Sequence, residues 1–200
     1  MERLLNAFRQ YENEDGLLEA VPMNNLVDWP PNLRDDYDLE RAKSGVNTVL
    51  NALYIGALGA GSRIARELGR AGRAAQWQRA AMERTLVFNG ILFDDERGLY
   101  VDASGSDHAS LHANVLPLYF GICPPDAVSS IVSLIARKRF SCGVYFAAFV
   151  LRALYRAGHP ELAYDLLTSR DRNSWANMLR CGATTTLEAW DPDLKWNTSW

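Results

Sequence analysis

The sequence predicts an all-α fold in which helical hairpins form part of an α/α toroid. The strongest evidence is the segment Ser44–Leu68, where hydrophobic residues recur at steps of three and four and charged residues occupy the other face. A second helix, expected from Ala74 to Phe88, follows a short turn, so the two should form an antiparallel hairpin. The alternative is an α-solenoid, whose turns are short and polar. Here residues 13–38, 94–108 and 183–200 form long, aromatic and acidic connections, which favours the toroid.

The remaining elements also follow from local patterns. A short extended piece at Leu99–Val101 precedes a helix near Ala109–Tyr119, which Pro117 should interrupt because proline lacks an N–H group. Pro124 and Pro125 open the next helix, since proline suits a first turn. Later helices are expected at Asp126–Arg137, from Tyr145 to Gly158, at Glu161–Leu167, and from a cap at Asn173 or Ser174 to Gly182. There is no linker or low-complexity run, so residues 1–200 are expected to form a single domain.

Composition excludes several classes of function. The chain has 200 residues, of which 48% are hydrophobic, so it can bury a substantial core. A net charge of −3 gives no electrostatic footprint for nucleic acid or an anionic membrane. No apolar run approaches the roughly 20 residues of a spanning helix, and the first residues do not have the pattern of a signal peptide. A cytoplasmic location is therefore expected. Three widely spaced cysteines form no CxxC motif, so neither a disulfide framework nor a metal or other cofactor is expected.

Tryptophan is abundant and lies beside polar residues. There are six tryptophans. Trp29 lies between an aspartate and a proline, in Asp28-Trp29-Pro30, and Trp190 is followed by an aspartate and a proline. An indole ring can stack on the C–H face of a sugar while a neighbouring carboxylate binds its hydroxyls. Two prolines after Trp29 should also hold it rigidly as a stacking platform. The alternative is that each tryptophan anchors a loop to a helix.

Glu188 is the candidate catalytic carboxylate. It lies in the stretch GATTTLEAW, where the β-branched threonines should be extended. Alternation would then place Thr184, Thr186, Glu188 and Trp190 on one side. A carboxylate flanked by hydroxyls and an indole can stay ionised and activate a water molecule, as a general base must. The alternative is a glutamate that accepts hydrogen bonds from backbone amides in a loop.

Two histidines form a further candidate group in the stretch DHASLHAN. His108 and His112 are four residues apart and could face one way on a helix, as metal ligands do. No third ligand is evident nearby, so metal binding is not favoured. The remaining alternatives are that these histidines and Asn114 bind substrate hydroxyls at the helix start, or that they form a structural cluster. Asp35, Asp36 and Asp38 are interpreted as solvated turn residues.

Four segments together resemble a known family. They are VDWPPNLRDDYD, VNTVLNALYIGAL, DHASLHANVLPLYFGICP and SWANMLRCGATTTLEAWDPDLKWNTSW, and they occur in the same order as in the catalytic domain of α-L-rhamnosidases, glycoside hydrolase family 78. The resemblance covers nearly the whole chain. It implies an (α/α)6 barrel that hydrolyses terminal α-L-rhamnose from glycosides with inversion at the anomeric carbon. It further implies that Glu188 is the general base and that Trp29, Trp190 and the region of His108 and His112 lie on the sugar side. Asp28 and Asn114, which belong to the same stretches, are expected to bind substrate with them.

The same resemblance leads us to expect an incomplete barrel. Inverting glycosidases need two carboxyls roughly 6.5–9.5 Å apart, one of which donates a proton. In the family, the proton donor lies before the part that matches Met1, and another sugar-contacting histidine follows the part that matches Trp200. We therefore expect the C-terminal part of the barrel without its general acid, with apolar helix faces available for self-association. The alternatives are a non-catalytic sugar-binding or scaffold module, and a toroidal glycosidase for another sugar.

Overall fold

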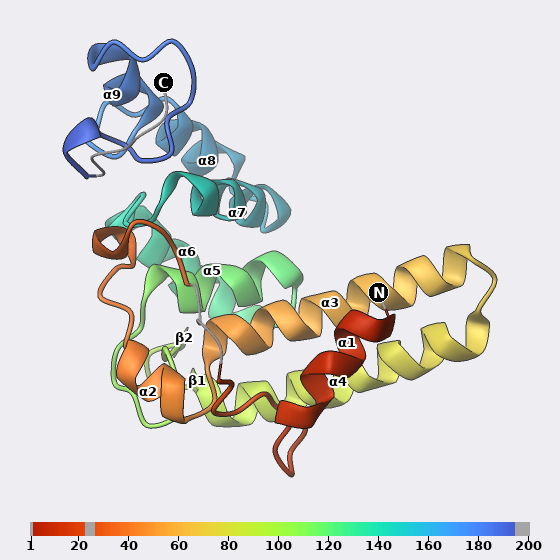
Figure 1. The fold of residues 1–200 in the computed structure, drawn as a ribbon. Coiled ribbons are helices and arrows are strands. Elements are labelled where there is room, and N and C mark those ends of the chain that lie inside the picture. Colours follow the sequence, from red (N-terminus) through yellow and green to blue (C-terminus); the bar gives the residue numbers. More distant parts are fainter. Residues whose placement is uncertain (1, 23–26, 195–200) are drawn as a thin grey trace.

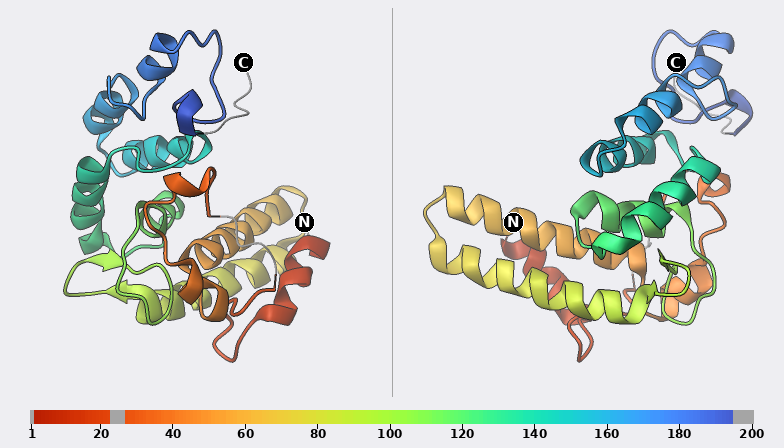
Figure 2. Two further views of the ribbon diagram at one scale, coloured as in Figure 1. Left: turned by 60° about the vertical axis from the view of Figure 1, so that its left-hand side comes forward. Right: turned by 180° about the vertical axis from the view of Figure 1, so that it is seen from behind.

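The computed structural model describes residues 2–22 and 27–194, which form a curved succession of helices (Figures 1 and 2). The α-helices are α1 (Glu2–Phe8), α2 (Leu39–Ser44), α3 (Thr48–Glu67), α4 (Ala71–Leu92), α5 (Leu111–Phe120), α6 (Val128–Lys138), α7 (Val144–Arg156), α8 (Pro160–Leu167) and α9 (Trp175–Arg180). Short 3-10 helices occur at Arg9–Tyr11, Pro31–Leu33, Pro125–Ala127 and Pro192–Leu194. Strands β1 (Phe93–Asp94) and β2 (Leu99–Tyr100) form a small antiparallel pair.

The helices are arranged as hairpins side by side. Helices α3 and α4 form the longest hairpin and project beyond the others in Figure 1. Helices α3, α5 and α7 contact one another in series, while α4, α6 and α8 each pack against the preceding member of that row. This arrangement confirms the predicted all-α fold built from helical hairpins.

Helix α3 begins four residues later than the periodicity predicts. Residues before it are held in bridges to other segments, Val46 pairing with Glu19 and Asn47 with Ala103. The side chain of Asn47 then caps the helix by accepting a hydrogen bond from the Leu50 N–H. Long-range pairing therefore overrides the helical tendency of residues 44–47.

The N-terminal segment is attached to α3 by a buried amide. The side chain of Asn51 is fully buried, accepts a hydrogen bond from Leu18 N at 2.7 Å, and donates to Leu18 O and Asn47 O, each at 2.9 Å. Glu12 is held in the same region by Arg84 and by the Tyr54 hydroxyl, both at 2.6 Å. The pKa of Tyr54 is raised by burial and by its hydrogen bond to the Glu12 carboxylate.

Pro117 does not interrupt α5, contrary to the prediction. The helix runs without a break from Leu111 to Phe120 with Pro117 inside it. Residues 111–118 are all buried, and proline removes only one intrahelical hydrogen bond. Packing on every side of this short helix outweighs that loss.

The segment after α9 does not form the predicted extended strand. Residues 184–190 follow a series of bends, and Thr184, Thr185 and Thr186 are exposed. Leu187, Ala189 and Trp190 are buried in the core, so the predicted alternation of faces is wrong here. No strand pairs with this segment among the described residues, and the burial of Trp190 sets its course instead. Ser174, one of the two predicted caps, caps α9.

Candidate functional site

The loop at residues 27–38 lies across the start of α5 and the α6–α7 junction. Its Asp35 carboxylate accepts a hydrogen bond from Leu111 N at 2.6 Å and pairs with Lys138 Nζ at 2.8 Å. Asp35 is thus an anchor of the loop rather than the solvated turn residue that was expected. Trp29, which precedes Pro30 through a cis peptide bond, keeps 40% of its surface exposed. The predicted stacking platform is therefore accessible.

Asp28 is the buried centre of this region. Its Oδ1 accepts a hydrogen bond from Trp29 N at 2.8 Å. Its Oδ2 accepts one from Gly143 N at 2.6 Å and lies 2.7 Å from Nε2 of His112. One carboxylate therefore connects the Trp29 loop, helix α5 and the α6–α7 junction.

His112 has no accessible surface for a substrate. Its side chain is fully buried, its ring lies 4.3 Å from that of Phe146 between centroids, and its Nδ1 has no hydrogen-bond partner among the described residues. The expectation that Asp28 and His112 bind sugar hydroxyls is therefore corrected. The two side chains bind each other inside the protein.

His108 lies at a different place from His112. It precedes α5, which begins at Leu111, so the two histidines do not share a helix face. Its Nδ1 lies 2.6 Å from the buried carboxylate of Asp102, which also accepts hydrogen bonds from the N–H groups of Asp38 and Ser110. The His108 side chain is 36% exposed, so substrate contact by His108 stays a prediction.

Asn114 has a structural role. Its side chain is fully buried, accepts a hydrogen bond from Tyr100 N at 2.8 Å, and donates to Tyr100 O and Ser110 O. The two bonds to Tyr100 fasten β2 to α5, and the bond to Ser110 O lies within the first turn of α5 itself. Both amide donors are used and no surface is exposed, so the expected contact between Asn114 and a sugar is also corrected.

Trp190 anchors the loop that carries Glu188. The indole is fully buried, and its Nε1 donates a hydrogen bond to the Cys142 carbonyl at 2.6 Å. Its ring stacks on Phe140 at 5.3 Å and meets Trp175 edge-on at 4.9 Å. Trp190 therefore offers no stacking face for a sugar, and of its two predicted roles the structure has the anchoring one. Glu188, two residues earlier, is half-buried.

Asp191 fixes the loop on its other side. Its carboxylate accepts hydrogen bonds from the Asp193 N–H at 2.9 Å and the Asn177 side-chain amide at 3.1 Å. The hydrogen bond from Asp193 is the main influence that lowers the pKa of Asp191, and Asn177 and Arg172 act in the same direction. Asn177 of α9 also donates to the Trp190 carbonyl, so the end of the segment carrying Glu188 is fastened to α9.

The structure brings together Asp28, Trp29, His112 and the loop of Trp190 around the peptide unit of Cys142 and Gly143. Cys142 and Gly143 were not singled out as site residues from the sequence. The available signal was the glycine directly before the predicted helix. In the structure, a Cβ at position 143 would overlap Trp29 O and the Asp28 carboxylate, which explains why glycine is needed there. Burial, together with the nearby charges of Asp28 and Asp35, raises the pKa of the Cys142 thiol well above its ordinary value.

The described residues contain no group of three or more histidine, cysteine, aspartate or glutamate side chains able to hold a metal ion. Within the same part of the chain, no helix is long and apolar enough to cross a membrane. Residues 23–26 of the predicted 13–38 connection and residues 195–200 of the predicted 183–200 connection lie outside the described part.

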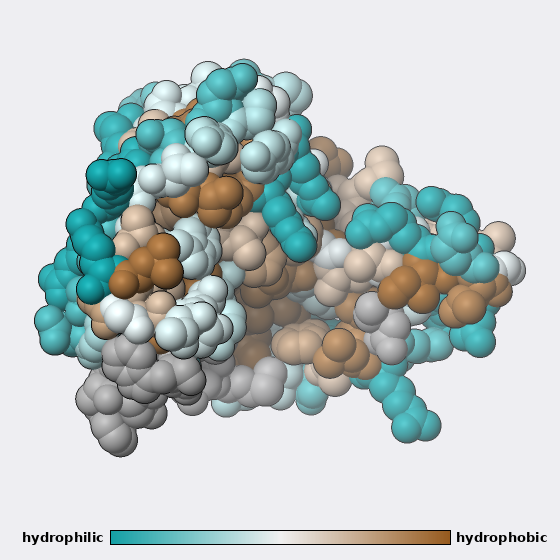
Figure 3. Space-filling view, turned by 90° about the horizontal axis from the view of Figure 1, so that it is seen from above, coloured by the Kyte–Doolittle hydropathy of each residue, from teal (hydrophilic) through white to brown (hydrophobic). Residues whose placement is uncertain are grey.

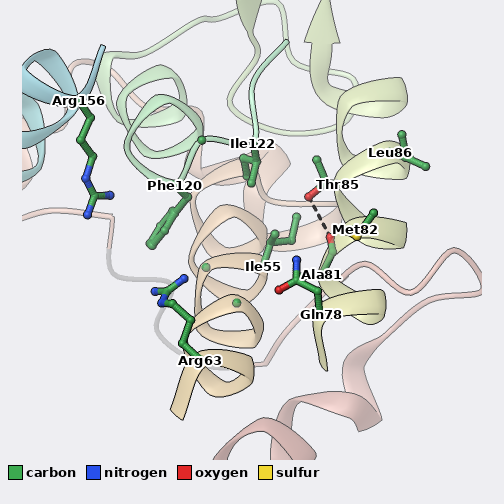
Figure 4. Close-up of a pocket in the computed structure, with 13 residues that line it drawn as sticks. Ile55, Arg63, Gln78, Ala81, Met82, Thr85, Leu86, Phe120, Ile122 and Arg156 are labelled. Carbon is green, nitrogen blue, oxygen red and sulfur yellow. Dashed lines mark hydrogen bonds between the residues drawn. The ribbon is translucent and has the colours of Figure 1, made fainter. Parts of the chain in front are cut away.

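A cavity of about 610 Å³ lies elsewhere, between the α3–α4 hairpin and the end of α5 (Figure 4). Arg63 of α3, Arg156 of α7 and Phe120, the last residue of α5, line this cavity. Viewed from above, the molecule has a hollow with mostly hydrophobic side chains at its centre (Figure 3).

Large exposed apolar side chains occur on several helices, including Ile64, Leu68, Met82, Leu86, Tyr145 and Leu179. Self-association through such faces stays a prediction.

Comparison with known proteins identifies relatives of this arrangement. The family model of the bacterial alpha-L-rhamnosidase 6 hairpin glycosidase domain matches residues 1–200. A GH78 family rhamnosidase of Bacillus sp. GL1 is similar in structure, with a TM-score of 0.78 and 25% identity over 96% of this chain and 20% of that chain. The Streptomyces avermitilis alpha-L-rhamnosidase complexed with L-rhamnose gives a TM-score of 0.73 at 22% identity, over 97% of this chain and 17% of that one.

An alpha-L-rhamnosidase from Aspergillus terreus gives a TM-score of 0.70 at 18% identity, over 96% of this chain and 23% of its own length. The chain thus spans about a fifth of the length of these solved relatives. A comparison with curated protein sequences found no match.

Proposed function

Because the chain belongs to the family of bacterial α-L-rhamnosidase six-hairpin glycosidase domains, we propose that it supplies the base-bearing part of an active site that hydrolyses terminal α-L-rhamnose from glycosides. The observation that carries the proposal is the shared anchorage of two segments. The exposed Trp29 and the loop of Glu188 are both fastened to the peptide unit of Cys142 and Gly143, through Asp28 and Trp190 respectively.

Trp29 would provide the sugar-binding surface. Its exposed indole can stack on the C–H face of a pyranose, and Asp28 fixes the backbone N–H of the same residue. The Streptomyces avermitilis relative was solved with L-rhamnose, which supports rhamnose as the sugar for this chain.

Glu188 would act as the general base of an inverting reaction. Its carboxylate takes a proton from a water molecule as the water oxygen bonds to the anomeric carbon. The glycosidic C–O bond breaks at the same time, and a second carboxyl group protonates the leaving oxygen. The family resemblance leads us to propose that this acid lies outside residues 1–200.

Substitution of Glu188 tests this role. In the full-length protein that carries the chain, Glu188→Gln should lower kcat on an aryl α-L-rhamnoside by about 10²–10⁴-fold, the usual contribution of a positioned general base. Glu161→Gln is the matched control, because Glu161 is an exposed residue of α8. Wild-type turnover in the Glu188 variant would refute its assignment as the base.

The stereochemistry of the first product tests inversion separately. Proton NMR of the initial product should show β-L-rhamnose before mutarotation, since water attacks the face opposite the leaving group. Initial release of the α-anomer would contradict an inverting mechanism. A wild-type protein that binds L-rhamnose in calorimetry but has no turnover would favour the non-catalytic sugar-binding alternative, for which the exposed Trp29 is equally suited.

A further inference from the structure

We propose that the buried Asp28–His112 pair is a positioning device that holds Trp29 and the Glu188 loop in one fixed relation. This inference rests on the proposed function and deepens it. Both residues are buried, since the His112 side chain has no exposed surface and that of Asp28 is only 5% exposed. Both would therefore act on the sugar site through other residues.

The first half of the device is the carboxylate of Asp28. A buried carboxylate is strongly destabilising unless donors surround it. Asp28 has three such donors, namely the backbone N–H groups of Trp29 and Gly143 and the Nε2 atom of His112. Because Nδ1 of His112 has no partner, the ring's one hydrogen bond among the described residues is the bond to Asp28. His112 is thus the third hydrogen-bond donor to the buried Asp28 carboxylate, which in turn orients Trp29 through its backbone N–H.

The second half is a single peptide unit. Gly143 N donates to Asp28 at 2.6 Å, and the carbonyl oxygen of the same peptide bond, that of Cys142, accepts from Trp190 Nε1 at 2.6 Å. A peptide unit is planar and rigid, so a rotation that follows Asp28 also moves the acceptor of Trp190. Hydrogen bonds arranged in such a chain also polarise one another. Asp28 and Trp190 are therefore mechanically and electrostatically connected.

The connection reaches both parts of the proposed site. On one side it ends at Trp29, whose backbone is bonded to Asp28. On the other it ends at Trp190, two residues after Glu188 and further fastened because Asn177 donates to the Trp190 carbonyl. A change at Asp28 or His112 should consequently alter sugar binding and turnover together.

Variants at the pair can separate positioning from simple stability. In Asp28→Asn, whichever way the amide is turned, at least one backbone N–H loses its acceptor. His112→Leu removes the donor to Asp28, whereas His112→Gln retains one, because the glutamine Nε2 can occupy a place similar to that of the imidazole Nε2. Asn51→Leu is the control, since it removes three buried hydrogen bonds in the first turn of α3, to Leu18 and Asn47, and none of the bonds of this connection.

The first measurement is ¹⁹F NMR of the full-length protein labelled with 5-fluorotryptophan, with Trp29 and Trp190 assigned from their phenylalanine variants. Asp28→Asn and His112→Leu should shift or broaden both resonances. His112→Gln should restore them, and Asn51→Leu should leave both unchanged. A response of Trp29 without Trp190, or an equal response to Asn51→Leu, would overturn the proposal.

The second measurement is steady-state kinetics on the aryl rhamnoside. Loss of a hydrogen bond to a charged group should lower kcat/KM by about ten-fold or more, with KM raised and kcat lowered together. An effect on KM alone would reject the link to the Glu188 loop. If the wild-type protein hydrolyses no rhamnoside, the proposed function fails, while the ¹⁹F result still decides whether the pair positions both tryptophans.

Discussion

Substitution of Gly143 by alanine tests the closeness of the α6–α7 junction to the Trp29 loop. Gly143 has φ −70° and ψ 164°, which alanine adopts without strain, so any loss of stability must come from steric overlap in the folded protein. A methyl group there would overlap the backbone oxygen of Trp29 and the Asp28 carboxylate. Neither can move easily, because one is main chain and the other is held by three hydrogen bonds.

The expected loss of stability follows from three contributions. Overpacking a close contact costs about 1–3 kcal/mol, and weakening the hydrogen bond from Gly143 N to a charged carboxylate costs up to about 1.5–3 kcal/mol. The lower entropy of alanine in the unfolded chain offsets about 0.4–1 kcal/mol. The free energy of unfolding should therefore fall by about 2–5 kcal/mol.

Urea denaturation followed by tryptophan fluorescence measures this difference. Gly90→Ala is the matched control, because Gly90 is exposed within α4 and has open space around its Cβ position. The control should gain about 0.5–1 kcal/mol of stability from better helix propensity. If Gly143→Ala unfolded at the same urea concentration as the wild type, the close approach described here would be wrong.

Three further predictions concern Asn114, Asp191 and Cys142. Asn114→Ala leaves Tyr100 N without its side-chain acceptor, so the free energy of unfolding should fall by at least about 1–3 kcal/mol in urea titrations. The hydrogen bond from Asp193 lowers the pKa of Asp191, so the contribution of Asp191 to stability is full above about pH 4 and is lost as pH falls through the lowered pKa. Asp191→Asn should flatten that part of the stability–pH curve. Cys142, fully buried with a raised thiol pKa, should resist a thiol reagent at about pH 8 until the protein unfolds.

The helices could be predicted from the sequence because their patterns are local. The periodicity of α3, the prolines before α6 and the serine cap of α9 each act within a few residues. The start of α3 was misplaced because Val46 and Asn47 pair with Glu19 and Ala103, which lie far away in the chain. Local patterns carry no information about such pairings.

The candidate site could be predicted only in part. Trp29 is accessible as expected, whereas Asp28 and His112, 84 positions apart, face each other in the interior. Residue type alone suggested that both could bind hydroxyls, but only the packing of α5 against the 27–38 loop decides what they contact. Trp190 shows the same limit. Its indole donates to the main-chain carbonyl of residue 142, which every residue type has, so the identity of that residue gives no sign of the contact.

The use of main-chain atoms at the α6–α7 junction has a consequence for how this region can vary during evolution. Position 142 contributes its carbonyl oxygen to the connection, so other small side chains should replace the cysteine there without loss. Position 143 contributes its N–H group and has no room for a side chain. Among homologues that keep Asp28 and Trp190, we therefore expect drift at position 142 beside an invariant glycine at position 143.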